Sequence, residues 1–538
     1  MKVLLTALSA KAIHKTLAPW CLKAYCDAHV PACEVIVQEH TINDHMGDIV
    51  TEIFQAAPDV VGFSCYIWNI EQVVKTAQML KKYLPQCIII LGGPEVSFEA
   101  DCSNYPFADY IIQGAGEAAL AGLITELMDG KTAHGEIITS CPVPMRDLPS
   151  PYTEAYYASF GAGRMGAIQN QLVYYESARG CPFSCTYCLS SSFQGVDELP
   201  ISRVLVELDD LVAHGATCIK FVDRTFNANR KRAAEILRHI LTMETTCTFH
   251  FEVAADLFDP ELLTLISQMP TRRVQFEIGI QSTNDATLSE IDRKMQIEEV
   301  LQNIQTLVGF GNCHIHVDLI AGLPFETMES FAKGIDACIS VRPHMLQLGF
   351  LKLLKGTKIR ENRAEYGYVY NDFAPYEVFC SDGINFQEMI KLKEIEAVVD
   401  KFYNSGVFVN TINYAIDHGF GCAYPFFEAL ADCCKGKNLK VSPKQAYTIL
   451  LHFLLQHMDK AQAEHVIKLD ALTFHTKNVL PDEIAVNRDK RGEETFRRSV
   501  QPWYHNVRVE FFDYDRKTRV FVYDKKDEMQ NAYQVIEL

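Results

Sequence analysis

The sequence predicts an α/β protein in three parts: a doubly wound parallel sheet, a partial (β/α)6 barrel, and a mostly helical C-terminal part. Three observations support this prediction. Short apolar runs alternate with amphipathic stretches over residues 1–140, the alternation resumes over residues 166–370, and helical periodicity dominates from residue 375. Apolar runs of this kind between amphipathic helices are typical of parallel strands that are covered on both faces. With 538 residues, the chain is too long for a single core.

The first part, residues 1–140, is expected to be a Rossmann-like domain because short strands and helices alternate along it. Ligands of such domains bind at the carboxyl ends of the strands. The expected strands are Lys2–Leu8, Cys33–His40, Val60–Ser64, Cys87–Leu91 and Tyr110–Gln113. The expected helices are Pro19–His29, Asp44–Ala56, Ile70–Tyr83 and Ala118–Met128.

A linker is expected at residues 141–165, where several Pro and Gly residues occur with little periodicity. The next part, residues 166–370, is expected to be a partial TIM-type barrel, with its chemistry at the C-terminal ends of the strands. Its six expected strands are Leu172–Glu176, Cys218–Val222, Thr248–Val253, Arg273–Ile278, Cys313–Leu319 and Met345–Phe350. The last part, residues 375–538, is expected to be mostly helical and to end in a hairpin of Val507–Tyr514 with Thr518–Tyr523.

Composition narrows the classes of function. The formal net charge of -18 argues against broad, non-specific nucleic-acid binding. No export signal is expected at Met1–Leu5, and the longest apolar runs are too short for a membrane span. Most of the 18 cysteines stand singly in apolar stretches, as reduced thiols of a cytoplasmic protein do.

Cys181, Cys185 and Cys188 depart from that pattern, because they follow the first expected barrel strand closely and have spacings of three and two residues. Such a loop can place three thiolates around a [4Fe–4S] cluster and leave the fourth iron open. The amine and carboxylate of S-adenosylmethionine (SAM) can chelate that iron. Zinc is the alternative, but zinc normally takes four protein ligands and no His lies within the loop. A chance grouping of buried cysteines is the other alternative.

This loop resembles that of the radical SAM superfamily, and the resemblance extends over residues 166–370, with the aromatic Tyr187 before the last cysteine. Later segments are similar to the SAM-binding segments of that family. Asp223 stands where many members carry Gly-Gly-Glu, so the partner of the SAM amino group stays open. Loop capping and turn formation are the alternative roles for these residues. The resemblance implies SAM contacts at Asp223, Glu252, Glu277, Gln281, Gly322 and Pro324.

Three strand-end turns of the first part suggest a ligand site, because glycines there let a bulky planar ligand approach the backbone. The turn after the first strand lacks Gly-x-Gly-x-x-Gly, which argues against NAD. Beside a radical SAM segment, the three turns resemble the cobalamin-binding domain of cobalamin-dependent radical SAM proteins. Asp44-His45-Met46-Gly47 does not have the spacing of a cobalt-ligating histidine motif, so the resemblance implies cobalt without a protein histidine below it. The cobalamin-binding candidates are Ser64, Tyr66, Trp68, Asn69, Gly92, Gly93, Pro94, Gly114, Gly116 and Glu117.

The resemblance implies an enzyme with a 4Fe-4S cluster, SAM and cobalamin as cofactors. The favoured activity is methyl transfer to an unactivated carbon via a deoxyadenosyl radical and methylcobalamin. The alternatives are a cobalamin-assisted rearrangement, cyclisation or oxidation, methylthiolation of tRNA, and a sensor without turnover. The expected partners are an electron donor such as flavodoxin or ferredoxin and a small-molecule or peptide substrate; no catalytic residue is assigned.

The C-terminal part is similar to the extension of a poorly characterised group with the same three-part layout, and we expect it to cover the mouth of the barrel. Its aromatic pairs and basic stretches could contact a nucleic acid. The favoured interpretation is that the aromatic residues belong to the core and that the basic residues lie on a solvated face. The segments concerned are Phe426-Phe427, Trp503-Tyr504, Arg488–Arg491 and Arg497-Arg498.

Overall fold

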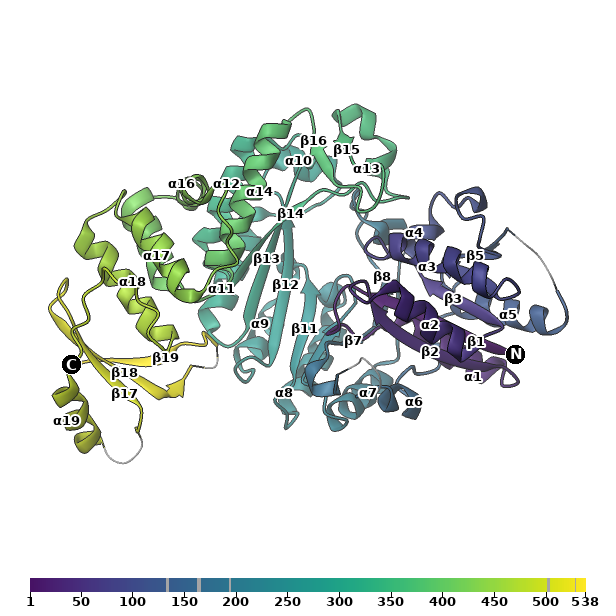
Figure 1. Ribbon diagram of the computed structural model, residues 1–538, viewed down its shortest axis with the longest axis horizontal. Helices are drawn as coiled ribbons and strands as arrows, with labels where there is room; N and C mark the ends of the chain where they lie inside the picture. The colour runs from purple at the N-terminus through teal and green to yellow at the C-terminus, as the bar shows by residue number, and fades with distance from the viewer. Residues whose placement is uncertain (132–134, 162–165, 193–194, 501–503, 528) are drawn as a thin grey trace. The chain divides into compact units, whose positions relative to one another are not determined.

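The structure is a computed structural model that describes residues 1–131, 135–161, 166–192, 195–500, 504–527 and 529–538 (Figure 1). The chain forms two compact units. The first contains Met1–Leu265, Glu290–Arg293 and Lys352–Phe379, and the second contains Ile266–Ser289, Lys294–Leu351 and Cys380–Leu538. Part of the predicted linker, residues 162–165, and Trp503 lie outside the described residues.

The first unit begins with a parallel sheet in the order β2-β1-β3-β4-β5-β6. Seven of the eight residues of β1 are buried, as expected for a strand covered on both faces. A sixth strand, β6, was not expected; its residues alternate between half-buried and exposed, so it carries no apolar run. The strands are β1 (Lys2–Ser9), β2 (Glu34–Thr41), β3 (Val60–Ser64), β4 (Ile88–Gly92), β5 (Tyr110–Gln113) and β6 (Glu136–Thr139).

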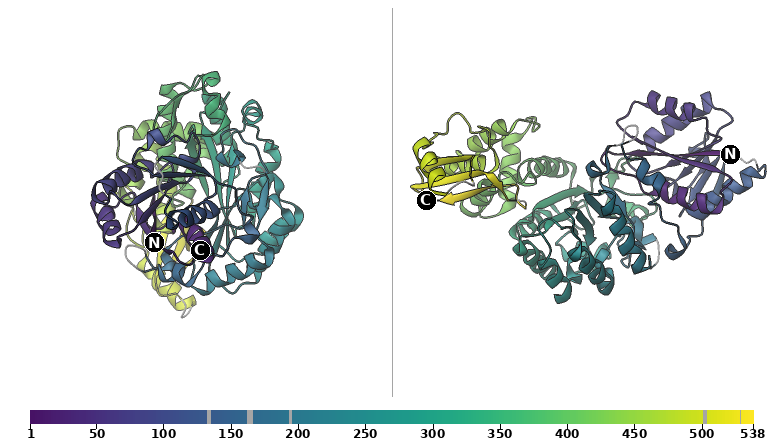
Figure 2. Two further views of the ribbon diagram at one scale, coloured as in Figure 1. Left: turned by 90° about the vertical axis from the view of Figure 1, so that its right-hand side faces the viewer. Right: turned by 90° about the horizontal axis from the view of Figure 1, so that it is seen from below.

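Helices cover both faces of this sheet (Figure 2, right). Leu120 and Ile124 of α5 share one apolar core with Cys26 of α1. Ile53 of α2 and Leu80 of α3 belong to a second core, which confirms the doubly wound architecture. The helices of this part are α1 (Ala18–His29), α2 (Met46–Ala56), α3 (Ile70–Tyr83), α4 (Pro94–Ser97) and α5 (Glu117–Met128), with α6 (Glu154–Ala158) in the predicted linker.

The second sheet has the order β14-β13-β12-β11-β10-β7, with β7, β10 and β11 in the first unit and β12 to β14 in the second. The pairs β7–β10, β10–β11, β12–β13 and β13–β14 are parallel, and helices alternate with the strands, as predicted for a partial (β/α)6 barrel. The strands are β7 (Val173–Tyr175), β10 (Cys218–Phe221), β11 (Thr248–Val253), β12 (Val274–Gln281), β13 (His314–Ala321) and β14 (Met345–Phe350). The helices are α7 (Ile201–Ala213), α8 (Arg230–Thr242), α9 (Pro260–Ser267), α10 (Asp285–Glu290), α11 (Ile297–Phe310) and α12 (Met328–Ser340).

A short antiparallel pair, β8 (Ala178–Gly180) with β9 (Val196–Glu198), was not expected. Gly180 has a φ of 99°, and a Cβ atom there would lie 2.2 Å from the carbonyl oxygen of Gly195. Only glycine fits so close a backbone approach. The pair therefore fixes the chain immediately before Cys181.

The C-terminal part of the second unit is mostly helical, as predicted, and ends in a three-stranded antiparallel sheet (yellow in Figure 1). The expected hairpin corresponds to β17 and β18. Strand β19 was missed because its residues show no alternation of buried and exposed positions. The elements are α14 (Phe386–Val398), α15 (Val409–Ala415), α16 (Ala423–Cys434), α17 (Pro443–Leu454), α18 (Lys460–Phe474), α19 (Lys490–Val500), β17 (Val507–Phe512), β18 (Lys517–Lys526) and β19 (Tyr533–Glu537).

Along the chain, α13 (Lys358–Glu361) follows the last barrel strand and belongs to the first unit. The strand pair β15 (Val369–Tyr370) and β16 (Val378–Cys380) comes next, and of these residues only Cys380 belongs to the second unit. Helix starts follow local capping chemistry. At α14, the Asn385 side chain accepts a hydrogen bond from the backbone N–H of Glu388, and the Glu388 side chain accepts one from the backbone N–H of Asn385.

Within the described ranges, the structure contains no helix that is long and apolar enough to cross a membrane.

Candidate functional site

The loop after β8 carries the three cysteines that the sequence singles out. Cys185 is buried and Cys181 and Cys188 are half-buried, and all three are free thiols. The backbone N–H of Cys188 donates to the carbonyl of Cys185 at 3.1 Å, which closes a tight turn between the last two cysteines. Three thiols on one such loop are the donor set of a [4Fe–4S] cluster with one open iron. The residues present therefore fit the cluster.

The start of this loop is held by Asp223, which follows β10. Its Oδ1 accepts from the backbone N–H groups of Ser177 (2.7 Å) and Ala178 (3.1 Å). Burial raises the pKa of Asp223 to about 6, and these hydrogen bonds oppose the shift. Asp223 thus has a structural role beside the SAM contact expected for it, and that contact stays a prediction.

Arg293 was not singled out from the sequence, yet it lies against the cluster loop within the first unit. Its Nη1 donates to Cys185 Sγ at 3.7 Å and to the hydroxyl of Tyr187 at 3.4 Å. Burial raises the pKa of the Cys185 thiol, and the Arg293 guanidinium opposes that shift. The two residues are 108 positions apart, so no local spacing in the sequence could show the contact.

Glu252 lies on β11 and is half-buried. In the second unit, Gln281 ends β12, while Gly322 and Pro324 follow β13. Gln281 has a φ of 73° and Gly322 a φ of 90°, so both occupy backbone conformations that L side chains rarely adopt. Gln281 is strained in this conformation whereas glycine is not, and strained positions cluster at ligand sites.

Hydrogen bonds connect these two strand-end turns. Ser282 donates to the buried carboxylate of Glu326, and Asn284 Nδ2 donates to the carbonyl of Phe325 at 3.0 Å. Burial raises the pKa of Glu326. The structure thereby brings together the turns that carry Gln281, Gly322 and Pro324. Their SAM contacts stay predictions.

The turn after β3 is organised by Asn69. Its Oδ1 accepts from the N–H of Tyr66 at 2.7 Å, and its Nδ2 donates to the carbonyls of Leu8 (3.0 Å) and Ser64 (2.9 Å). The Asn69 side chain thus connects the ends of β1 and β3. Within this turn Trp68 is 47% exposed, and its ring stacks on Tyr66 at 4.3 Å between centroids.

The Gly-Gly-Pro turn after β4 fits a bulky planar ligand. Gly93 has a φ of 110°, and a Cβ atom there would lie 2.6 Å from the carbonyl oxygen of Cys65. A Cβ atom on Gly92 would meet nothing closer than 3.9 Å. Gly93 is therefore required by the turn itself, while Gly92 leaves space that a ligand can fill. Pro94 begins α4.

The turn after β5 also has a glycine in the left-handed region, Gly114, with a φ of 93°. Gly116 then lies against α1, because a Cβ atom there would be 2.9 Å from a methyl group of Leu22. These positions provide backbone that a planar ligand could approach closely.

Glu117, at the start of α5, connects the last of these turns with the chain that leads to the cysteines. Arg179 Nη2 donates to Glu117 Oε1 and to Glu176 Oε2, both at 2.9 Å. Hydrogen bonds and charge from the two glutamates raise the pKa of Arg179 against its burial. The three side chains line one cavity together with Cys21. Arg179 thus connects the cobalamin candidate Glu117 with the cluster loop, because Arg179 lies two residues before Cys181 in the sequence.

Three family models match the chain. Residues 3–124 match the B12 binding domain, residues 175–338 the radical SAM superfamily, and residues 364–524 a protein of unknown function (DUF4080). The first two matches lie on the glycine turns and on the cysteine loop described above. The chain thus carries a B12 binding domain followed by a radical SAM domain, the combination that the sequence predicts. Cobalamin, a [4Fe–4S] cluster and SAM are accordingly its cofactors, as predicted.

Two curated relatives illustrate the likeness. Over 328 residues the chain is 27% identical to the 2-(S-pantetheinyl)-carbapenam-3-carboxylate methyltransferase of Streptantibioticus cattleyicolor, covering 53% of this chain and 46% of the relative. Over 331 residues it is 25% identical to the cobalamin-dependent radical SAM methyltransferase TokK of Streptomyces tokunonensis, covering 55% and 47%. The chain thus spans about half the length of these relatives.

The fold is similar to that of OxsB, a cobalamin-dependent S-adenosylmethionine radical enzyme solved with aqua-cobalamin bound. The TM-score is 0.59 at 14% sequence identity, and the match covers 93% of this chain and 75% of OxsB. At this level of identity the likeness shows the fold. It extends beyond the two cofactor domains into the C-terminal part.

Proposed function

We propose that the chain is a cobalamin-dependent radical SAM methyltransferase that acts on an unactivated carbon. One observation carries the proposal: a three-cysteine cluster loop and the glycine turns of a B12 binding domain occur in one compact unit. Curated relatives that bear the name methyltransferase support it. The alternative is a cobalamin-assisted radical rearrangement, cyclisation or oxidation without methyl transfer.

Cys181, Cys185 and Cys188 would hold the cluster, and the turn at Gly92 and Gly93 would take the corrin ring. When bound, the cluster with SAM supplies a carbon-centred radical for hydrogen abstraction, and cobalamin supplies the methyl group. The protein must exclude water and hold the substrate in one orientation, because a radical otherwise reacts with the nearest side chain.

The chain's own residues serve this role through fixed polar contacts. Asp223 holds the backbone at the entry to the cluster loop. Arg293 places a permanent positive charge beside Cys185. Arg179, held by Glu117 and Glu176, orients the segment just before Cys181. In this proposal each residue positions a cofactor-binding segment and none is assigned to proton transfer.

The proposed partners follow from the chemistry. A one-electron donor such as flavodoxin or ferredoxin would reduce the cluster in the cytoplasm. The substrate would be a small molecule or a peptide. The acidic net charge of -18 disfavours bulk nucleic acid as the substrate.

The test is anaerobic reconstitution with iron, sulfide and hydroxocobalamin, followed by SAM and a strong reductant, with products identified by mass spectrometry. We expect deoxyadenosine to form and cobalamin to stay bound through gel filtration. The control is Cys181→Ala, which should lose the cluster absorbance and deoxyadenosine formation together. Deoxyadenosine formation without retained cobalamin would contradict methyl transfer, and its absence from the wild-type protein would contradict the radical SAM activity.

A further inference from the structure

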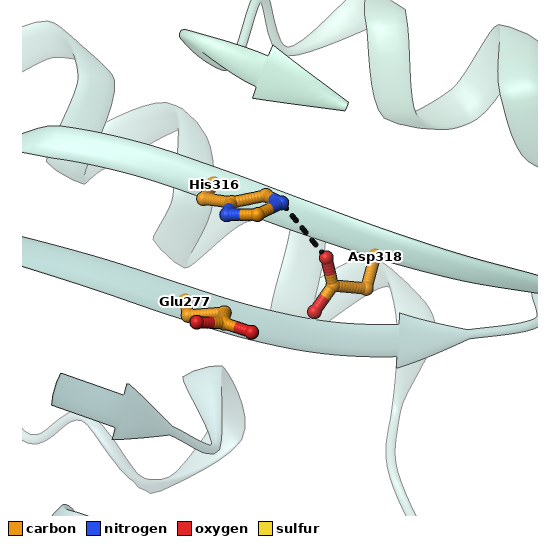
Figure 3. A group of neighbouring side chains, drawn as sticks. All are labelled: Glu277, His316 and Asp318. Atoms are coloured by element: carbon orange, nitrogen blue, oxygen red, sulfur yellow. Dashed lines mark ion pairs between the residues drawn. The ribbon is translucent and has the colours of Figure 1, made fainter. Parts of the chain in front are cut away.

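Three ligand-type side chains lie together on the wall formed by β12 and β13 (Figure 3). Glu277 comes from β12, and His316 and Asp318 come from β13, where residues two apart point to the same face. Glu277 is the direct register partner of His316. One ligand atom from each residue lies within 4.8 Å of the other two. All three residues belong to the second unit.

His316 is more than nine-tenths buried, with 7% of its surface exposed, and its Nε2 points into this group (Figure 3). Nε2 lies 3.0 Å from Asp318 Oδ1. The two atoms form an ion pair when the imidazole is protonated (Figure 3), and neither has a hydrogen-bond partner within the described part of the chain. A buried imidazole nitrogen without such a bond is costly, and a bound ligand would remove that cost.

The spacing fits the coordination shell of one metal ion. With bonds of about 2.0–2.2 Å, two ligand atoms of one tetrahedral zinc ion lie about 3.3–3.6 Å apart. The Nε2–Oδ1 separation of 3.0 Å is close to this range. An ion placed beside the pair would accept lone pairs from both atoms, which requires no alignment of an N–H with the carboxylate.

The donor set selects the class of ion. An imidazole nitrogen suits zinc and its first-row neighbours, whereas magnesium and calcium prefer oxygen ligands alone. We propose that Glu277, His316 and Asp318 bind a divalent first-row ion, with zinc favoured, in addition to the cluster iron and the cobalt. Three protein ligands leave one position for water or for a Lewis-basic group of a bound molecule. The proposal gives Glu277 this role in place of the expected SAM contact.

The test uses the full-length protein with its cluster reconstituted, stripped of loosely bound metal by a chelator and supplied with one equivalent of zinc. Zinc content by elemental analysis and X-ray absorption at the zinc edge are then measured. We expect one zinc per chain with a shell of nitrogen and oxygen atoms at about 2.0–2.2 Å. A sulfur shell at about 2.3 Å would place the zinc on cysteines and would overturn the proposal.

The variants Asp318→Asn and His316→Gln each remove one ligand and keep the size of the side chain similar. Zinc affinity should fall by more than about 100-fold, because loss of an outer-shell partner alone costs about 10–100-fold. His314→Gln is the matched control, since His314 precedes His316 on the same face of β13. Wild-type protein that retains no zinc, or equal loss in the control and the ligand variants with unchanged circular dichroism, would refute the site. Because neither readout involves SAM turnover, failure here leaves the proposed activity untouched.

Discussion

Arg293 illustrates what a single residue can contribute beside the cluster loop. Its half-buried guanidinium contacts Cys185 Sγ and the Tyr187 hydroxyl. Hydrogen bonds and positive charge at the sulfur ligands stabilise the reduced form of an iron–sulfur cluster, which carries the more negative charge. Arg293 should therefore make the cluster easier to reduce.

Replacing Arg293 with Met should shift the midpoint potential of the cluster to more negative values. A tenfold loss in the reduction equilibrium would appear as about 59 mV for one electron. The measurement is a redox titration followed by electron paramagnetic resonance. Arg293→Lys should restore part of the shift because it keeps the charge. Lys294→Met removes an exposed neighbouring charge and should leave the potential unchanged; an equal shift in this control would contradict the specific role of Arg293.

At the scale of elements, Asp470 connects two helices of the C-terminal part. This buried side chain on α18 accepts from the backbone N–H of Asn410 (3.1 Å) and of Thr411 (2.7 Å) at the start of α15. Burial raises its pKa to about 6, above the model-compound value of 3.8, although the hydrogen bonds oppose the shift. The folded protein therefore holds a proton on Asp470 at pH values where the unfolded chain has lost it.

This difference predicts the direction of a pH effect on stability. The contribution of Asp470 should be fully present below about pH 4 and be lost as pH rises through about 6. Asp470→Asn should remove that pH dependence, so the stability of the variant relative to wild type should increase between pH 4.5 and pH 7 by about 1–3 kcal/mol. Urea unfolding of both proteins at the two pH values measures this difference in the free energy of unfolding. Asp459→Asn, an exposed change at the start of α18, serves as the control. A constant difference between Asp470→Asn and wild type would show that burial does not raise this pKa.

Sequence reasoning recovered the core strands of both parallel sheets to within a few residues. Buried parallel strands are apolar runs, and an apolar run is visible in one sequence. The strands it missed are short and partly exposed: β6, β8, β9, β15, β16 and β19. The cysteine spacing predicted the cluster loop because its three ligands are neighbours along the chain. The contacts of Arg293 with Cys185 and of Ser282 with Glu326 could not be predicted, because they join distant segments.

For the whole molecule, the two cofactors should be separable by changes at one glycine turn. A Cβ atom on Gly92 meets nothing closer than 3.9 Å, so Gly92→Val should fold while filling the space proposed for the corrin ring. Gly93→Val instead places side-chain atoms against Cys65 in a left-handed conformation and should destabilise the turn itself.

We therefore expect Gly92→Val to lose bound cobalamin, with an affinity at least about tenfold weaker, and to keep the full cluster absorbance. The measurements are absorbance spectra after gel filtration and thermal unfolding of the same sample. Gly93→Val should lose cobalamin and also unfold at a lower temperature. If Gly92→Val lost the cluster and cobalamin together, the turn would be a structural element of the whole first unit. Cobalamin bound as tightly as in the wild type would place the corrin ring elsewhere.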